Sequence, residues 1–535
     1  MSSPTRQATS SCTSPAHEVA PLHHLTEPAH PLEKLMPHAR ITLDPAFVVG
    51  PVRRNTFGTF VEHLGRCVYT GIYEPDHATA TAEGFRGDVL ALTQELGVST
   101  VRYPGGNFVS GYRWEDGTGP MATRPRRLDL AWHSTETNEV GVNEFIAWTR
   151  AAGTEPMMAV NLGTRGVQEA LNLLEYCNLP GGTHYSDLRR THGIEEPHQI
   201  KFWCLGNEMD GPWQIGHKTA REYGRLAAET ARAMRMIDPD LTLVACGSSS
   251  SAMPTFGTWE REVLEEAYEQ VDLISAHAYY AEHDGDLASF LASAVDMDRF
   301  IDAVTATADA VRAAGGHTKT IGISFDEWNV WYQHRAESRP PSDQDWPVAP
   351  VLLQDTYNVA DAVVVGNLLI SLLRHTDRVH AASLAQLVNV IAPIMTEPGG
   401  AAWKQTIFHP FALTSAHAAG QVLDVAVQSP HQDTARFGDV PVLDAVATHD
   451  EQSGAVTVFS VNRSVTETLT LDLDTRGFGP VRLVESFTLA NPDPYLAATA
   501  EESVAPQPNG TATVTGQQVQ VELPPVSWTM LRLAP

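Results

Sequence analysis

Short apolar runs alternate with longer segments of helical periodicity from about residue 40 to residue 395. Short apolar runs are typical of buried strands, and apolar positions that recur with a helical period indicate helices that pack on one face. Eight strands with intervening helices predict a (β/α)8 TIM barrel. The alternative, an open doubly wound sheet, normally has a glycine-rich turn after its first strand, and none follows Glu62. The predicted strands end at Glu62, Arg102, Asn161, Gly206, Ala245, His277, Phe325 and Gln386, and the predicted helices cover 85–96, 143–152, 167–177, 220–237, 259–268, 287–314 and 357–373.

The pattern changes after about residue 410, where short alternating runs are separated by turn formers such as 450–454 and 508–510. This pattern of short strands and turns predicts an all-β sandwich of jelly-roll-like type. We therefore expect an α/β chain with a disordered arm over 1–37, a strand in 38–54 that joins the sandwich, a barrel over 55–410 and a C-terminal sandwich over 411–535. The predicted sandwich strands are 422–427, 442–448, 455–462, 469–473, 481–489, 511–515 and 519–523.

The chain has 535 residues, a net charge of −28 and a pI near 5.1. Such acidity disfavours nucleic acid as a partner, because phosphate backbones would be repelled. Five cysteines without a CxxC spacing predict neither a disulfide framework nor structural zinc, and we expect no metal and no cofactor. Residues 1–37 lack the apolar segment of a secretory signal, and no run is long enough for a transmembrane helix. We therefore expect no membrane association and a cytoplasmic location.

Two glutamates stand at the ends of apolar runs. Glu208 ends the run that begins at Ile200, and Glu327 ends the run that begins at Thr320. Glycosidic bonds are usually cleaved by two carboxyl groups, one that protonates the leaving oxygen and one that attacks or activates water. Because a parallel barrel gathers the C-terminal ends of its strands at one face, these distant side chains can converge. Asp326 competes with Glu327, and strict strand alternation would let only one of them face a pocket.

Polar side chains also mark the first strands of the predicted barrel. Glu62 ends the first strand, and Arg102 and Asn107 flank a glycine turn after the second. Arg102 can pair with a carboxylate, and Asn107 can donate to hydroxyl groups. Asn207 precedes Glu208 and can hold a sugar 2-hydroxyl.

The later strands supply further candidates. A phenol such as Tyr279, close to His277 at the end of the sixth strand, can keep a neighbouring carboxylate ionised. Gln386 ends the eighth strand, and Trp132 begins a polar aromatic loop over 132–138 that is placed to cover a pocket. For that loop, functional and structural interpretations carry equal weight. The serine-rich turn at 247–251 breaks the pattern of a nucleophile elbow, and 282–286 lacks the length of a calcium loop.

Together these residues resemble glycoside hydrolase family 51, the α-L-arabinofuranosidases. The resemblance runs from about residue 41 to 415, and the bare Asn-Glu pair is shared with a wider clan of retaining barrel hydrolases. The resembling stretches are 59–66, 101–112, 136–141, 205–213, 325–331 and 385–391.

The resemblance implies a retaining mechanism with Glu208 as general acid/base and Glu327 as nucleophile. It also implies a cytoplasmic homo-oligomer, commonly a hexamer, that needs no cofactor. Around this pair it places Glu62, Arg102, Asn107 and Asn207 near the furanose or the nucleophile, His277 and Tyr279 beside the two carboxyl groups, and Trp132, Trp331 and Gln386 around the pocket.

The leading hypothesis is an exo-acting α-L-arabinofuranosidase that releases terminal arabinofuranose from arabino-oligosaccharides by double displacement. An endo-xylanase or endo-glucanase on the same barrel keeps the chemistry and differs in loop shape, which sequence does not show. A non-catalytic sugar-binding protein is the alternative from another class. Two intact glutamates argue against it, because such acids mark working sites.

Overall fold

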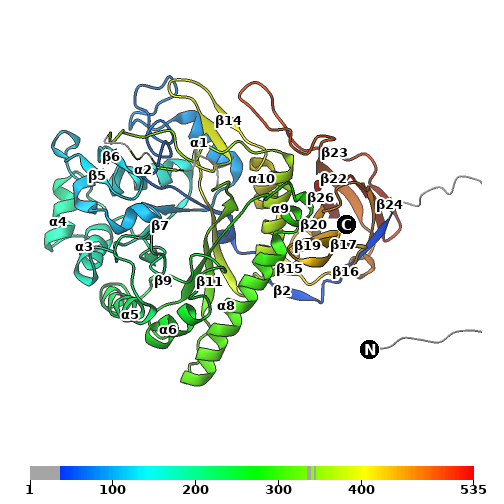
Figure 1. The fold of residues 1–535 in the computed structure, drawn as a ribbon, viewed down its shortest axis with the longest axis horizontal. Coiled ribbons are helices and arrows are strands. Elements are labelled where there is room, and N and C mark those ends of the chain that lie inside the picture. Colours follow the sequence, from blue (N-terminus) through cyan, green and yellow to red (C-terminus); the bar gives the residue numbers. More distant parts are fainter. Residues whose placement is uncertain (1–36, 334–338, 341, 343–344) are drawn as a thin grey trace, which may run out of the picture. The chain divides into compact units, whose positions relative to one another are not determined.

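The computed structural model describes residues 37–333, 339–340, 342 and 345–535. A closed parallel barrel is formed by strands that lie between Gly58 and Leu384 (Figure 1). The barrel strands pair in chain order, and the last pairs with the first, since Ser383 lies opposite Gly58. The predicted (β/α)8 barrel with a C-terminal all-β domain is confirmed. The predicted arm lies, apart from residue 37, outside the described residues. The barrel strands are β3 (Gly58–Phe60), β4 (Thr100–Tyr103), β7 (Glu155–Ala159), β8 (Phe202–Leu205), β9 (Thr242–Ala245), β10 (Leu273–Tyr280), β11 (Gly322–Val330) and β12 (Val379–Leu384).

Besides α10 (Phe408–His417), where no helix was predicted, the helices differ from the prediction at two places. The single helix predicted over 287–314 is wrong, because the chain forms two helices on either side of Ala292, and the Ser293 hydroxyl donates to the Phe290 carbonyl at 2.6 Å there. A short helix that was not predicted, α4, precedes β8. No helix in the described part of the chain is long and apolar enough to cross a membrane. The helices are α1 (Gly87–Leu96), α2 (Val142–Ala152), α3 (Val167–Asn178), α4 (His184–Thr191), α5 (Ala220–Ile237), α6 (Thr258–Ala267), α7 (Leu287–Leu291), α8 (Ala294–Gly315), α9 (Val359–Arg374) and α10 (Phe408–His417).

Besides a two-stranded hairpin of β17 (His431–Thr434) and β18 (Gly438–Pro441), the C-terminal domain consists of two sheets. Residues 38–51 contribute a strand to each sheet, and α10 crosses the predicted boundary at residue 410. The alternation of apolar and polar residues decides which face of a strand is buried. In β25, for example, Val519, Val521 and Leu523 are buried and the residues between them are exposed. The strand order of one sheet is β2 (Val48–Pro51), β15 (Gln421–Leu423), β19 (Leu443–Asp450), β20 (Ala455–Asn462), β26 (Ser527–Ala534), β22 (Arg482–Leu489) and β23 (Gln507–Pro508). The strand order of the other sheet is β16 (Ala426–Gln428), β1 (His38–Thr42), β21 (Leu469–Asp474), β25 (Gln518–Leu523) and β24 (Thr513–Thr515).

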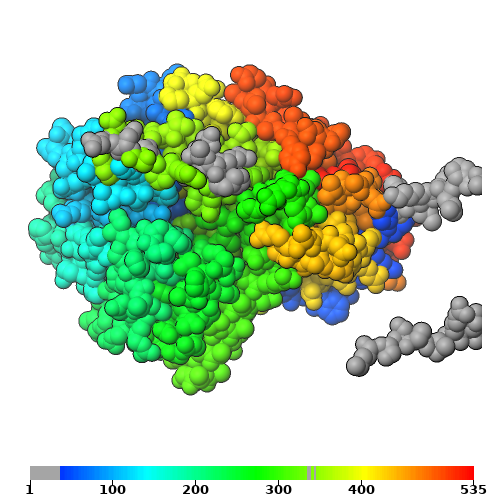
Figure 2. Space-filling view, in the orientation of Figure 1, coloured from blue at the N-terminus to red at the C-terminus, as the bar shows by residue number. Residues whose placement is uncertain are grey.

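Helix α9 joins the barrel to the C-terminal domain. Almost all of its residues are buried, and it contacts both β11 of the barrel and β19, β20 and β26 of the sandwich (Figure 1). Gly366 allows this approach, because a Cβ there would lie 2.2 Å from the Trp528 ring. In Figure 2, cyan and green atoms of the barrel cover one side of this view, and orange and red atoms of the sandwich cover the other.

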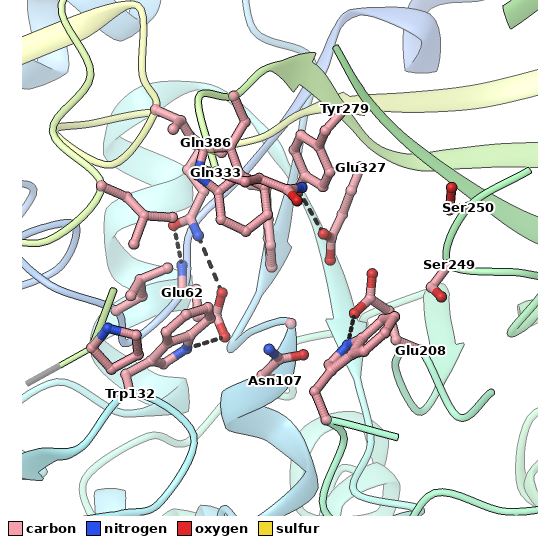
Figure 3. Close-up of a pocket in the computed structure, with 18 residues that line it drawn as sticks. Glu62, Asn107, Trp132, Glu208, Ser249, Ser250, Tyr279, Glu327, Gln333 and Gln386 are labelled. Carbon is pink, nitrogen blue, oxygen red and sulfur yellow. Dashed lines mark hydrogen bonds between the residues drawn. The ribbon is translucent and has the colours of Figure 1, made fainter. Parts of the chain in front are cut away.

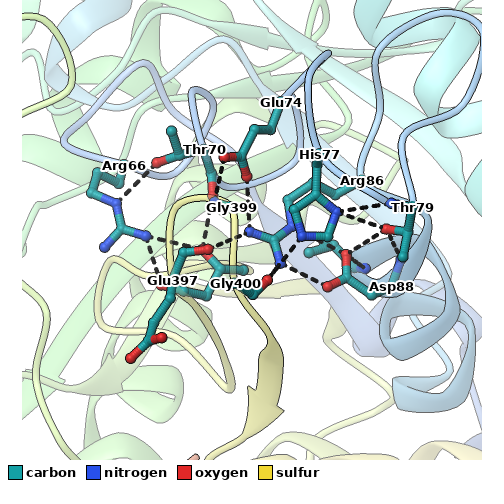
Figure 4. Close-up of polar contacts among 12 residues, drawn as sticks. Arg66, Thr70, Glu74, His77, Thr79, Arg86, Asp88, Glu397, Gly399 and Gly400 are labelled. Atoms are coloured by element: carbon teal, nitrogen blue, oxygen red, sulfur yellow. Dashed lines mark hydrogen bonds and ion pairs between the residues drawn. The ribbon is translucent and has the colours of Figure 1, made fainter.

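A buried arginine ties together two loops at the C-terminal face of the barrel (Figure 4). The Arg86 side chain is fully buried and donates to the carboxylates of Glu74, at 2.9 Å, and Asp88, at 2.7 Å. It also donates to the carbonyl oxygens of Glu397 and Gly400, at 2.8 Å and 2.7 Å. These carbonyls lie at the turn of a hairpin formed by β13 (Ile394–Thr396) and β14 (Ala402–Lys404). Arg86 therefore holds the loop between β3 and α1 against that hairpin.

We predict that Arg86→Met lowers the free energy of unfolding by about 3–5 kcal/mol, because it leaves two largely buried carboxylates without their cation. Urea unfolding followed by tryptophan fluorescence measures the change. Arg232→Met is the control, since the Arg232 side chain is 57% exposed and pairs with Glu229, whose side chain is 51% exposed. It should leave the midpoint unchanged. Equal midpoints for Arg86→Met and the wild type would contradict a structural role for this cluster.

Candidate active site

A cavity of about 470 Å³ opens at the C-terminal ends of the barrel strands (Figure 3). Side chains from segments far apart in the sequence meet there, as expected for a parallel barrel. Of the residues predicted for the site, Arg102, Asn207 and His277 are not among those that line the cavity. Arg102 and His277 contact its carboxyl groups, and Asn207 accepts a hydrogen bond from Arg102. The predicted residues that line it are Glu62, Asn107, Trp132, Glu208, Tyr279, Glu327, Trp331 and Gln386.

Glu208 and Glu327 lie beside each other in this cavity (Figure 3). One oxygen of each carboxyl group and a ring nitrogen of His277 lie within 4.8 Å of one another. Glu208 follows the end of β8 with a φ of +43°, in the left-handed region that non-glycine residues seldom adopt. Backbone strain of this kind is concentrated at functional sites.

The surroundings of Glu327 keep its carboxyl group ionised. Arg102 donates to one oxygen at 2.8 Å, and the Tyr279 hydroxyl donates to the other at 2.7 Å. Burial alone would raise the pKa of Glu327, but the charges of His277 and Arg102 and these hydrogen bonds outweigh it and lower that pKa. Glu327 is therefore a carboxylate at neutral pH.

An extra residue in β11 places two consecutive acids inside the barrel. Ser275 of β10 pairs with Ser324, but His277 pairs with Glu327, so β11 holds one residue more than β10 between these pairs. Asp326 consequently accepts a hydrogen bond from Ser324 and lies 3.8 Å from Arg102 Nε, while Glu327 binds the same guanidinium. The expectation that the two acids lie on opposite sides of the strand is wrong, whereas Glu327 alone of the two lines the cavity, as expected.

His277 bridges the two glutamates. Its Nδ1 lies 3.0 Å from Glu208 Oε1 and 3.7 Å from Glu327 Oε2. Burial disfavours the charged ring, but the two carboxylates outweigh it and raise the pKa of His277.

Within the described residues, Glu208, His277 and Glu327 are the one group of acid or histidine donors close enough together to hold a metal ion. The carboxylate oxygens already accept hydrogen bonds from protein donors, and the raised pKa of His277 favours a protonated ring without a free lone pair. We therefore interpret the group as an acid–base cluster.

A second buried acid, Glu62, forms the opposite side of the cavity (Figure 3). Its carboxyl group accepts hydrogen bonds from the Phe108 amide and Trp132 Nε1, both at 2.9 Å, and from Gln386 Nε2 at 3.1 Å. Gly106 is required beside it, because a Cβ there would lie 2.8 Å from a Glu62 oxygen. Burial raises the pKa of Glu62 to about 8 despite two of these donors.

Arg102 connects Glu327 to Asn207, the residue that precedes Glu208. Besides binding Glu327, Arg102 donates to Asn207 Oδ1 at 2.6 Å and lies over the Phe60 ring. This bond fixes the amide orientation, and Asn207 Nδ2 is left buried without a protein partner. Asn207 can therefore donate to a bound molecule next to Glu208.

Trp132 is carried by a hairpin formed by β5 (Arg127–Asp129) and β6 (Ser134–Glu136). Glu136, at the end of β6, lies 2.8 Å from His63 Nδ1, and the other His63 nitrogen lies 2.8 Å from the Tyr103 hydroxyl. This buried cluster anchors the hairpin to the loop after β3. The loop over 132–138 thus has both a structural anchor and a residue in the cavity.

Sequence reasoning missed several residues at the site. Trp213 donates to Glu208 Oε2 at 2.6 Å, and Ser249 and Ser250, in the turn rejected as a nucleophile elbow, line the cavity. Trp213 lies five residues after Glu208, within the stretch 205–213 that carries the family resemblance, so the sequence did offer a signal for it. Nothing in the sequence marked the two serines as site residues, because their position in the cavity depends on how the loop after β9 folds. The remaining lining residues are Phe60, Leu64, Gly106, Gln333, Pro340, Leu353 and Ile391.

Two family models match the chain. Residues 92–291 match a model described as α-L-arabinofuranosidase 1 domain, and residues 326–527 match one described as α-L-arabinofuranosidase C-terminal domain. Together they cover most of the barrel and most of the sandwich.

Characterised proteins and solved structures are similar over nearly the whole chain. An intracellular exo-α-(1→5)-L-arabinofuranosidase of Streptomyces lividans is 59% identical over 93% of this chain and 75% of its own length. An exo-α-(1→6)-L-arabinofuranosidase of Bifidobacterium longum is 54% identical over 92% of this chain and 97% of its own. The structure of a family 51 α-L-arabinofuranosidase from Bifidobacterium longum superposes with a TM-score of 0.89 at 50% identity, covering 93% of this chain and 99% of that one.

Proposed function

The chain belongs to glycoside hydrolase family 51, the α-L-arabinofuranosidases, and from this membership we propose that it is an exo-acting enzyme that releases terminal α-L-arabinofuranose from arabino-oligosaccharides with retention of configuration. The observation that carries the proposal is the approach of Glu208 and Glu327 to within 4.8 Å across one cavity. Retaining enzymes hold their carboxyl groups roughly 5–5.5 Å apart, whereas inverting enzymes need roughly 6.5–9.5 Å for an intervening water.

In the first step Glu208 gives its proton to the glycosidic oxygen while a Glu327 oxygen attacks the anomeric carbon. The carbon–oxygen bond to the leaving group breaks, and an ester bond to Glu327 forms. The lowered pKa of Glu327 supports its role as nucleophile, because the carboxylate is available at neutral pH. Asn207 Nδ2, buried without a protein partner, is suited to a sugar 2-hydroxyl.

In the second step water attacks the anomeric carbon, Glu208 takes its proton, and the ester bond to Glu327 breaks. Trp132 and Gln386 both donate to Glu62, so the three residues form a preorganised wall for the other hydroxyl groups. Asn107, Trp331 and Tyr279 complete the pocket in this proposal.

The curated relatives differ in linkage, since one is named for α-(1→5) and another for α-(1→6) bonds. Arabino-oligosaccharides are therefore the substrate class that we propose. The Streptomyces relative is named as intracellular, and we propose the same compartment here. The homo-oligomer stays a prediction that light scattering can test.

We expect the protein to hydrolyse 4-nitrophenyl α-L-arabinofuranoside and to release monomeric arabinose from arabino-oligosaccharides. Proton NMR of the first product should show the α-anomer, as double displacement requires. A β-anomer as first product would contradict retention. A fall in the viscosity of xylan or a soluble cellulose without release of arabinose would favour the endo-acting alternative, and saturable binding without turnover would favour the non-catalytic one.

Glu208→Ala should slow the hydrolysis of arabino-oligosaccharides by about 10²–10⁴-fold, the usual contribution of general acid catalysis. An activated aryl arabinofuranoside should lose far less in its bond-breaking step, since its leaving group needs no proton. Single-turnover kinetics with both substrates measure the difference. Glu229→Ala, on the exposed face of α5, is the control and should behave as wild type. Equal losses on both substrates would remove Glu208 from the acid role.

Tyr279→Phe removes the hydroxyl that donates to Glu327, so the pKa of Glu327 should rise. The low-pH limb of kcat/KM, which reports the ionisation of the nucleophile in the free enzyme, should move to higher pH by up to about one unit. Tyr280→Phe is the matched control, because the Tyr280 hydroxyl donates to Asp296 instead, at 3.2 Å. A limb that moves equally in both variants would refute this role for Tyr279.

A further inference from the structure

The loop between β11 and α9 contacts the β5–β6 hairpin across the top of the barrel. The Thr135 amide donates to the Pro347 carbonyl at 3.0 Å, and the Thr135 hydroxyl donates to the Trp346 carbonyl at 2.7 Å. The His133 ring stacks on the Trp346 ring, with centroids 3.8 Å apart and planes 21° from parallel. These contacts fix one end of a stretch of this loop, residues 346–354, which we call the rim segment.

The rim segment also contacts two further loops at the same end of the barrel. Arg66, in the loop after β3, donates to the Gln354 side chain at 3.3 Å. The amide of Ile391, in the loop after β12, donates to the Leu353 carbonyl at 2.8 Å. Because β4, β3 and β12 are neighbours in the closed barrel, the rim segment follows the C-terminal ends of three adjacent strands.

This part of the rim lies across the cavity from the residues that face the leaving group. Glu208 and Ser249 follow β8 and β9, and Glu62 lies opposite them, after β3 (Figure 3). Leu353 and Ile391 both line the cavity, so their contact forms part of its wall. A sugar whose anomeric carbon faces the two glutamates directs its far end towards this wall.

We propose that the rim segment closes the cavity beyond the bound sugar, and that Trp346, through its stack on His133, is a specificity-determining residue that restricts cleavage to terminal sugars. A chain that continued beyond the bound ring would meet this wall, whereas an endo-acting enzyme needs this side open. Trp346 does not line the cavity, so it acts by holding the wall in place. The proposal rests on the proposed function and assigns its exo selectivity to these contacts.

The test compares 4-nitrophenyl α-L-arabinofuranoside with its 5-O-methyl ether, in which the methyl group represents the start of a continuing chain. The wild type should prefer the unmodified substrate by about 10–200-fold in kcat/KM, the range for one carbon that a fitted pocket rejects. Trp346→Ala removes the stack, and this preference should fall by about 2–10-fold, the change that the loss of one aromatic pair can produce. General damage to the site would lower both rates together and leave their ratio unchanged.

Three further variants separate the stack from the fold. Trp346→Phe keeps a ring against His133 and should keep the wild-type preference. His133→Gly removes the other ring and should lower the preference as Trp346→Ala does, and glycine accepts the φ of +53° at this position without strain. His317→Ala is the matched control, since His317 stacks on Tyr268 with centroids 4.3 Å apart and neither residue lines the cavity.

A wild-type preference in folded Trp346→Ala or His133→Gly would overturn the proposal, as would a wild type that hydrolyses both substrates equally well. An equal fall in His317→Ala would also overturn it, because the effect would then not depend on the rim. Failure of the proposed function is a different result, since the wild type would then hydrolyse neither substrate.

Discussion

The ion pair between Arg102 and Glu327 is the contact on which the site depends. A lone carboxylate inside the barrel would be costly to keep charged, because it would lose its hydration without compensation. Arg102 removes that cost with a charged hydrogen bond at 2.8 Å, and the same guanidinium orients Asn207. Arg102 belongs to β4 and Glu327 to β11, so the pair spans the barrel interior. The chemistry of Glu327 therefore requires a closed barrel with all its strands in register.

Much of this arrangement could be predicted from the sequence, because a parallel barrel converts strand ends into neighbours. Glu62, Arg102, Glu208 and Gln386 were identified in this way, and the barrel and the all-β domain followed from the alternation of apolar runs. What escaped prediction depends on tertiary contacts. The bond from Trp213 to Glu208 requires a loop to turn back on itself, which local periodicity does not encode. The last strand, β26, was also not predicted.

Two buried polar clusters support the walls of the cavity at a distance from the reacting groups. One, around His63 and Glu136, anchors the hairpin that carries Trp132, and the other, around Arg86, joins the loop that contributes Leu64 to the β13–β14 hairpin. Fully paired polar clusters specify a single arrangement more strictly than apolar contacts, whose partners are interchangeable. The walls are thus fixed by directional bonds, which suits a pocket that must hold one small ring in one orientation.

The additional residue in β11 has a consequence for insertions and deletions. In a regular strand, losing one position near 325–328 would shift the downstream side chains by one step and exchange the inner for the outer face. Here Asp326 and Glu327 both face the barrel interior. Deleting one residue would restore regular alternation, and only one of two consecutive acids could then face inward. The length of this segment is consequently a constraint of its own, separate from the chemical requirement for a carboxylate at Glu327.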